Sequence, residues 1–190
     1  MNLPNKLTVL RILLMPLAFF LVFQNHWASF LSGYILSILI GFTDYFDGYL
    51  ARRYGTVTRF GQFLDPLADK IFVITLLLYF MEVHQIPAWF IILILIREFA
   101  MTDLRTLTAQ EKVNLHVDIF GKRKALFQYL LLFHLGYLRF LELIHSPLEG
   151  FFRIFAQGTL IFLLILVTFF TIFSMGNYLW KNQKYFLGLS

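Results

Sequence analysis

The most informative stretches of this chain are D-Y-F-D-G-Y-L-A-R, from Asp44 to Arg52, and G-Q-F-L-D-P-L-A-D, from Gly61 to Asp69. They hold four carboxylates in a sequence of 190 residues that is 59% hydrophobic and only 14% charged. On helices, the spacing within each pair of acids puts both side chains on one face, where two bare anions repel. A positive group between them is therefore expected. The acids are Asp44, Asp47, Asp65 and Asp69.

The composition around these acids points to a membrane protein. A mean hydropathy of +0.72 leaves too little polar surface for a water-soluble globule. The chain has no cysteine, so disulfides and thiolate metal sites are excluded. The five histidines are scattered without ligand spacing and are interpreted as interfacial or packing residues: His26, His84, His116, His134 and His145.

Six apolar runs approach the roughly 20 residues that a transmembrane helix needs. The sequence therefore predicts an all-α fold, an integral membrane bundle of six transmembrane helices that forms a single domain over residues 1–190. Lys70, Arg97 and Glu98 bring charge close to span ends, so those ends are expected to line a wet cavity rather than lipid. No small-x-small cleavage site follows the first run, so it is expected to be retained. The runs are about 7–24, 29–51, 66–82, 86–102, 125–143 and 154–179.

Lysine and arginine predict the orientation of this bundle. With the N- and C-termini in the cytosol, only Arg139 and Arg153 of the 16 basic residues lie outside, as the positive-inside rule requires. The net charge of +5 is then explained by topology and by contact with anionic membrane lipid. Nucleic-acid binding is not expected, because no soluble domain presents a groove.

This topology brings the four acids together. The second helix ends, and the third begins, on the cytosolic side, so the acids converge at the mouth of one helical hairpin. Oxygen ligands favour magnesium or manganese, and four carboxylates can hold two such ions in the clamp used for displacement at phosphorus. Gly48 and Gly61 would permit close approach of a nucleotide, although helix packing explains either glycine alone equally well.

Simpler explanations exist for single residues. Asp65 precedes Pro66 and fits an N-cap followed by proline at the first helical position. Lys70 fits a partner for one of the acids. A structural role for all four acids is harder to accept, because each buried carboxylate would need its own partner. A cation-binding transporter is the other functional class, but transporters hold such acids near the midplane of paired repeats, and no repeat is visible.

The pattern D-x2-D-G-x2-A-R-x8-G-x3-D-x3-D runs from Asp44 to Asp69 without a gap or substitution. By this signature the chain resembles the CDP-alcohol phosphatidyltransferase family. Further stretches are similar to the family members that form phosphatidylglycerophosphate, so the resemblance covers nearly the whole chain. These stretches are N-L-P-N-K-L-T-V-L-R (Asn2–Arg11), R-E-F-A-M-T-D-L-R (Arg97–Arg105) and G-K-R-K (Gly121–Lys124).

The resemblance implies an activity. The phosphatidyl group of CDP-diacylglycerol would pass to glycerol 3-phosphate, with release of CMP, on two magnesium or manganese ions. The enzyme would be a homodimer integral to the cytoplasmic (inner) membrane, with its active site facing the cytosol. Asp44, Asp47 and Asp65 would be metal ligands, and Asp69 would be both a ligand and the base that activates the acceptor hydroxyl.

The resemblance also implies two groups of binding residues. Gly48, Ala51, Arg52 and Gly61 would shape the nucleotide site. Asn5 and Thr8 are further candidates for this site, and capping of the first helix explains them equally well. A phosphorylated acceptor needs fixed cations, although a positive-inside marker would look the same in the sequence. The candidates for the acceptor phosphate are Arg97, Arg105, Lys122 and Lys124.

Two positions depart from the pattern of these relatives. Asp103 stands where glycine is usual, and Ala125 stands where a small hydroxyl residue is common. An acid two positions before Arg105 opposes an anionic acceptor. The alternative acceptors within the same chemistry are phosphatidylglycerol, as in cardiolipin synthase, and inositol phosphate. Asp103 is expected to point into the cytosolic loop and to leave the pocket cationic.

Overall fold

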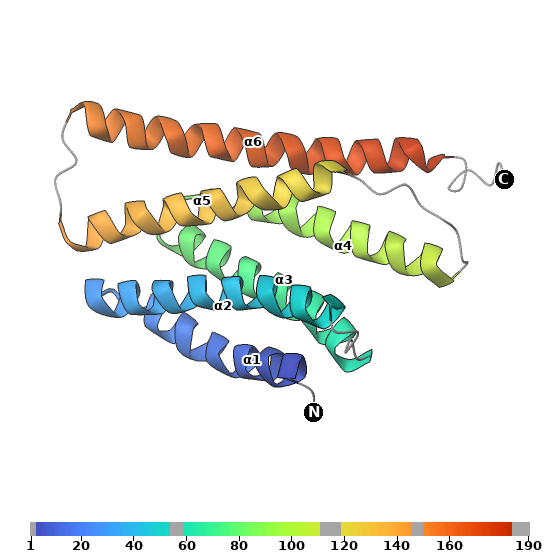
Figure 1. Cartoon of the computed structure of the whole chain (residues 1–190). Helices are drawn as coiled ribbons and strands as arrows, with labels where there is room; N and C mark the ends of the chain where they lie inside the picture. Colours follow the sequence, from blue (N-terminus) through green and yellow to red (C-terminus); the bar gives the residue numbers. More distant parts are fainter. Residues whose placement is uncertain (1–2, 54–58, 111–118, 146–149, 184–190) are drawn as a thin grey trace. The chain divides into compact units, whose positions relative to one another are not determined.

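The computed structural model describes residues 3–53, 59–110, 119–145 and 150–183, which form six α-helices and no strands (Figure 1). Within these ranges it describes the backbone, but not the side chains, of residues 3–8, 42, 44–53, 59–66, 105–110 and 119–122. The all-α prediction and its six helices are confirmed. The helices are α1 (Leu3–Val22), α2 (Trp27–Arg53), α3 (Arg59–Glu82), α4 (Ala88–Gln110), α5 (Ile119–Leu143) and α6 (Phe151–Lys181).

Three helices extend well beyond the apolar runs that predicted them. α3 begins at Arg59, α4 continues to Gln110 and α5 begins at Ile119. Hydropathy marks only the apolar part of a helix, whereas the backbone hydrogen bonds continue through polar residues. Pro66 therefore lies inside α3, and the interpretation of Asp65 as an N-cap is wrong.

The chain separates into two compact units. Unit 1 comprises Met1–Val83 and Gly136–Pro147, and unit 2 comprises His84–Leu135 and Leu148–Ser190. The helix α5 contributes residues to both. The four acids of the signature belong to unit 1, and the four basic residues expected at the acceptor phosphate belong to unit 2.

Close packing of α1 on α2 forms the centre of unit 1. A Cβ atom added to Gly33 on α2 would lie 2.7 Å from the backbone nitrogen of Val22 and 2.8 Å from the carbonyl oxygen of Ala18 on α1. Glycine is therefore required at this position, as is common where membrane helices approach closely. The ring of Tyr79 on α3 packs against those of Phe23 and Phe30, with centroids 5.1 Å and 5.9 Å away.

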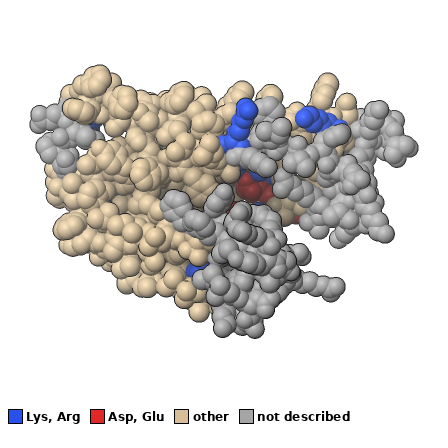
Figure 2. Space-filling model, viewed as in Figure 1, with Lys and Arg blue, Asp and Glu red and all other residues tan. Residues whose placement is uncertain are grey.

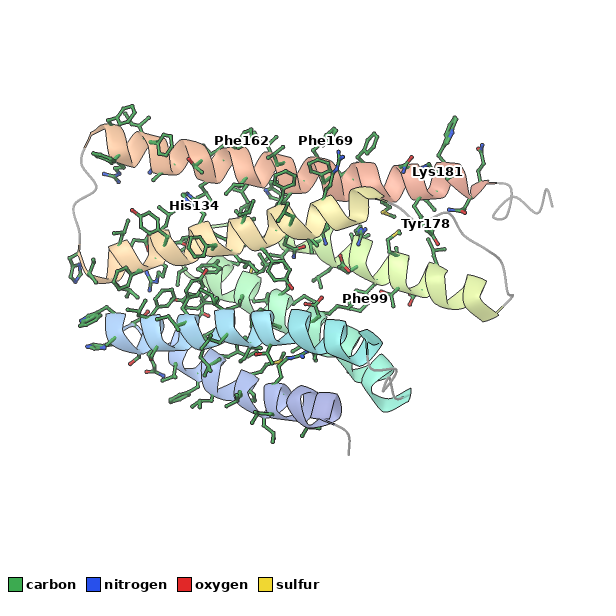
Figure 3. The ribbon with its side chains drawn as sticks, in the orientation of Figure 1. Phe99, His134, Phe162, Phe169, Tyr178 and Lys181 are labelled. Atoms are coloured by element: carbon green, nitrogen blue, oxygen red, sulfur yellow. The ribbon has the colours of Figure 1, made fainter. Side chains whose placement is uncertain are left out.

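Unit 2 is built on contacts of α4 and α5 with α6. α4 packs against α6. Phe127 on α5 stacks on Phe170 of α6, with ring centroids 5.0 Å apart. The Nε2 atom of His134 on α5 lies 2.9 Å from the carbonyl oxygen of Ala156 on α6, so this histidine links the two helices (Figure 3).

α6 carries the clearest membrane signal. Among the described residues it is the one helix that is both long and apolar enough to cross a membrane. Val9–Val22 and Trp27–Gly41 are shorter apolar helices. Large apolar side chains of α6 are exposed, including Phe162 at 59% and Phe169 at 54% (Figure 3). Figure 2 shows that the described surface in that view carries few charged side chains.

Candidate functional site

Two helices of unit 1 carry the signature acids. Asp44 and Asp47 lie on the last part of α2, and Asp65 and Asp69 lie on the first part of α3. Asp69 is half-buried next to the buried Ala68. The side chains of the other three acids lie outside the described residues. Among the side chains that the structure describes, no three His, Cys, Asp or Glu residues gather as a metal site.

A contact between α2 and α3 adjoins the acids. A Cβ atom on Gly41 of α2 would lie 3.9 Å from Cε1 of Phe72 on α3, which is an ordinary van der Waals distance. Asp44 follows Gly41 by less than one helical turn, and Asp69 precedes Phe72 by the same spacing. The two helices are therefore already close where the acids begin, as the predicted hairpin requires.

The expected nucleotide residues are placed by their backbone alone. Gly48, Ala51 and Arg52 lie on α2 and Gly61 lies on α3, next to the acids in sequence. Asn5 and Thr8 lie inside α1, which begins at Leu3, so neither is the N-cap of this helix and the capping explanation is wrong. The side chains of all six residues lie outside the described residues.

The structure brings together two of the four basic residues expected at the acceptor phosphate. Arg97 on α4 is 7% exposed and Lys124 on α5 is 3% exposed. Arg97 donates from Nη1 to Oε1 of Glu98 at 2.9 Å, and Lys124 donates from Nζ to the same oxygen. The side chains of Arg105 on α4 and Lys122 on α5 lie outside the described residues.

α6 contributes a hydroxyl to this group. Arg97 donates from Nε to Oγ of Ser174 at 3.3 Å, and Ser174 in turn donates to the carbonyl oxygen of Thr171 at 3.2 Å. We call Arg97, Glu98, Lys124 and Ser174 the Glu98 cluster. Its side chains come from three helices of unit 2 and carry two positive charges and one negative charge. These charges lie in a nearly buried place, where electrostatic interactions are stronger than in water.

Sequence reasoning did not assign a function to Glu98 or Ser174. Glu98 was recognised only as charge near a span end, because an acid beside a basic residue does not suggest an anion site. A signal for its role did exist: an acid in an apolar helix needs a partner, and Lys124 was available. Ser174 could be found from helical spacing, since it shares the buried face of α6 with Thr171 and Tyr178.

Asp103 is exposed, which leaves the Glu98 cluster without a second acid from this position. Asp103 lies on α4, which continues through it to Gln110, and the expectation that its side chain points into the cytosolic loop stays a prediction. The other departure from the pattern, Ala125, is also exposed.

Comparison with known proteins gives one family and several relatives. The model of a family described as CDP-alcohol phosphatidyltransferase matches residues 1–175. A protein of Rickettsia felis is 36% identical over 188 residues, which cover 97% of each chain. One of Rickettsia bellii is 42% identical over 130 residues (67% of this chain, 70% of the relative), and one of Bacillus subtilis is 39% identical over 135 (65% and 70%). All three are named CDP-diacylglycerol–glycerol-3-phosphate 3-phosphatidyltransferase.

Proposed function

This chain belongs to the CDP-alcohol phosphatidyltransferase family, and we propose that it transfers the phosphatidyl group of CDP-diacylglycerol to glycerol 3-phosphate. The products are phosphatidylglycerophosphate and CMP. One observation carries the proposal: the likeness to the named Rickettsia felis enzyme covers 97% of both chains. It therefore includes the acids of α2 and α3 as well as the Glu98 cluster.

The acids suit two divalent cations, magnesium or manganese. Hard cations prefer oxygen ligands, and the four carboxylates come from two helices that touch where the acids begin. Bound at Asp44, Asp47, Asp65 and Asp69, such ions would neutralise the charge of the diphosphate of CDP-diacylglycerol. Gly48, Ala51, Arg52 and Gly61, with Asn5 and Thr8, are the residues proposed to hold the cytidine nucleotide.

Asp69 is proposed as the general base. Its carboxylate would take the proton from the free hydroxyl of glycerol 3-phosphate as the hydroxyl oxygen attacks the phosphorus that carries the diacylglycerol. The new oxygen–phosphorus bond forms while the bond to the bridging oxygen breaks, and CMP leaves. Its half-buried position on α3 is compatible with this role, because the base must be both reachable and oriented.

The acceptor phosphate is proposed to bind at Arg97, Arg105, Lys122 and Lys124. Two of these cations meet at Glu98 in a nearly buried place. A phosphorylated acceptor would gain from such a site, whereas a neutral alcohol would not. This argument favours glycerol 3-phosphate over phosphatidylglycerol at this position, because the latter offers only a phosphodiester with a single charge.

We further propose that the chain is a single membrane domain over residues 1–190 with six transmembrane helices and cytosolic termini. The site would face the cytosol from the inner membrane, and the enzyme would be a homodimer. The positive-inside distribution supports this orientation. The exposed apolar side chains of α6 support burial in lipid.

The test is an acceptor screen with purified protein in detergent. CDP-diacylglycerol is supplied with glycerol 3-phosphate, inositol phosphate, phosphatidylglycerol, serine or inositol, and CMP release and the lipid product are measured. We expect turnover with glycerol 3-phosphate that stops with EDTA and returns when magnesium or manganese is added in excess. The absence of product with glycerol 3-phosphate would refute the proposal, and CMP release with another acceptor would identify the alternative.

A further inference from the structure

Glu98 meets both of the buried cations, Arg97 and Lys124, through a single oxygen. Arg97 and Lys124 each donate to Oε1. The two donors come from different helices, α4 and α5. Oε1 of Glu98 thus connects the two basic residues that the proposed acceptor site would use.

The guanidinium of Arg97 is also held in a fixed orientation. Ser174 accepts from Nε of Arg97 while Glu98 accepts from Nη1, so the guanidinium plane is held from two directions. Nη2 takes part in neither bond. A guanidinium fixed in this way can offer a further donor to an oxyanion without first losing side-chain freedom.

The physical need for Glu98 follows from burial. Two cations side by side repel, and the repulsion is strong where water is largely excluded. Removing the acid from a buried ion pair leaves an uncompensated charge, which costs far more than the pair contributes. Without Glu98, Lys124 would be driven away from Arg97 or out toward water.

We propose that Glu98 is a positioning residue for the acceptor: it holds Arg97 and Lys124 together as a preformed pair for the phosphate of glycerol 3-phosphate. This inference rests on the proposed function. Glu98 does not touch the reacting atoms, so its loss should weaken acceptor binding rather than the chemical step.

The test replaces Glu98 with glutamine, which keeps the shape and removes the charge. For Glu98→Gln we expect the KM for glycerol 3-phosphate to rise by about tenfold or more. The KM for CDP-diacylglycerol and kcat should stay within about twofold, because neither depends on the acceptor cations. Glu142→Gln is the matched control, since Glu142 also accepts from an arginine, Arg139, but belongs to unit 1.

A double-mutant cycle separates positioning from general destabilisation. If Glu98 acts through Lys124, the change Lys124→Gln should raise the KM for the acceptor much less in the Glu98→Gln background than in the wild type. Additive effects would overturn the proposal. If Glu98→Gln does not fold, Glu98→Asp decides: it keeps the charge but shortens the reach, so a raised acceptor KM supports the proposal and an unchanged one refutes it.

The inference and the proposed function can fail separately. If the wild-type enzyme releases no CMP with glycerol 3-phosphate, the proposed function is refuted. If the wild-type enzyme turns over glycerol 3-phosphate and a folded Glu98→Gln variant has an unchanged or lowered KM for the acceptor, only the proposed role of Glu98 is refuted.

Discussion

Arg139 on α5 donates from Nε to the hydroxyl of Tyr79 on α3, at 3.0 Å. The same guanidinium donates from Nη2 to Oδ1 of Asn25 at 2.9 Å and from Nη1 to Glu142 at 3.1 Å. Arg139 was predicted from the sequence only as one of two basic residues on the outer side. The structure shows that its hydrogen bond to Tyr79 also connects the last part of α5 to the aromatic residues in the core of unit 1.

The change Arg139→Gln should destabilise the protein. It would leave the hydroxyl of Tyr79, a residue only 2% exposed, without this partner, and a buried group that loses its hydrogen bond costs about 1–3 kcal/mol. Thermal unfolding in detergent measures the loss. Turnover by the folded fraction should be unchanged, because Tyr79 lies about 15 Å along α3 from Asp69. Arg153→Gln removes an exposed arginine and is the control; equal losses in both variants would contradict the role of Arg139.

Gly33→Ala should also destabilise unit 1, through packing. The added Cβ atom would meet the backbone of α1 at 2.7 Å and 2.8 Å, which a backbone cannot relieve by rotating a side chain. Overpacking of this kind costs about 1–3 kcal/mol. Gly41→Ala is the matched control on the same helix, because its Cβ atom would find Phe72 at an ordinary 3.9 Å. The thermal midpoints of the two variants are compared, and a Gly33→Ala variant as stable as Gly41→Ala would show that α1 and α2 are not this close.

Much of the fold could be predicted because hydrophobic run length determines how many helices a membrane chain forms. The ends of the helices could not be predicted, because polar residues such as Arg59 continue a helix beyond its apolar run and hydropathy does not mark them. The contact of Gly33 with α1 was also out of reach, since a glycine in a helix does not reveal which helix it faces. Hydropathy alone could not distinguish Gly33 from Gly41.

The candidate site, too, could be predicted from the sequence only in part. The topology predicted from the sequence placed the four acids on one hairpin, and the contact between Gly41 and Phe72 agrees with that prediction. The arrangement of their carboxylates stays a prediction. For the acceptor residues, the sequence supplied Arg97 and Lys124 but not the acid between them. The charge pattern of a sequence identifies Lys124 as a candidate for binding. It does not show that Glu98 on α4 is the counter-ion of Lys124 on α5, because that pairing depends on the tertiary structure.

Asp103→Asn should have little effect on acceptor use, although Asp103 departs from the pattern of the relatives. Its side chain is exposed on α4, and an exposed charge contributes little through water, so the KM for glycerol 3-phosphate should change by less than about twofold. Steady-state kinetics at low and moderate salt check this. A large fall in KM would mean that Asp103 repels the acceptor, and would favour a less highly charged acceptor in the native enzyme.

Asp69→Asn should abolish turnover while leaving the binding of CDP-diacylglycerol largely intact. Asparagine has the size of the aspartate but cannot take the proton of the acceptor hydroxyl, and loss of a general base lowers kcat by roughly 10²–10⁴-fold. Asp103→Asn, the same exchange at an exposed site, is the control and should turn over at nearly the wild-type rate. CMP release measures the first effect, and direct binding of CDP-diacylglycerol in detergent measures the second. An Asp69→Asn enzyme that turns over normally would exclude Asp69 as the base. Loss of both binding and turnover would instead assign Asp69 mainly to holding the diphosphate.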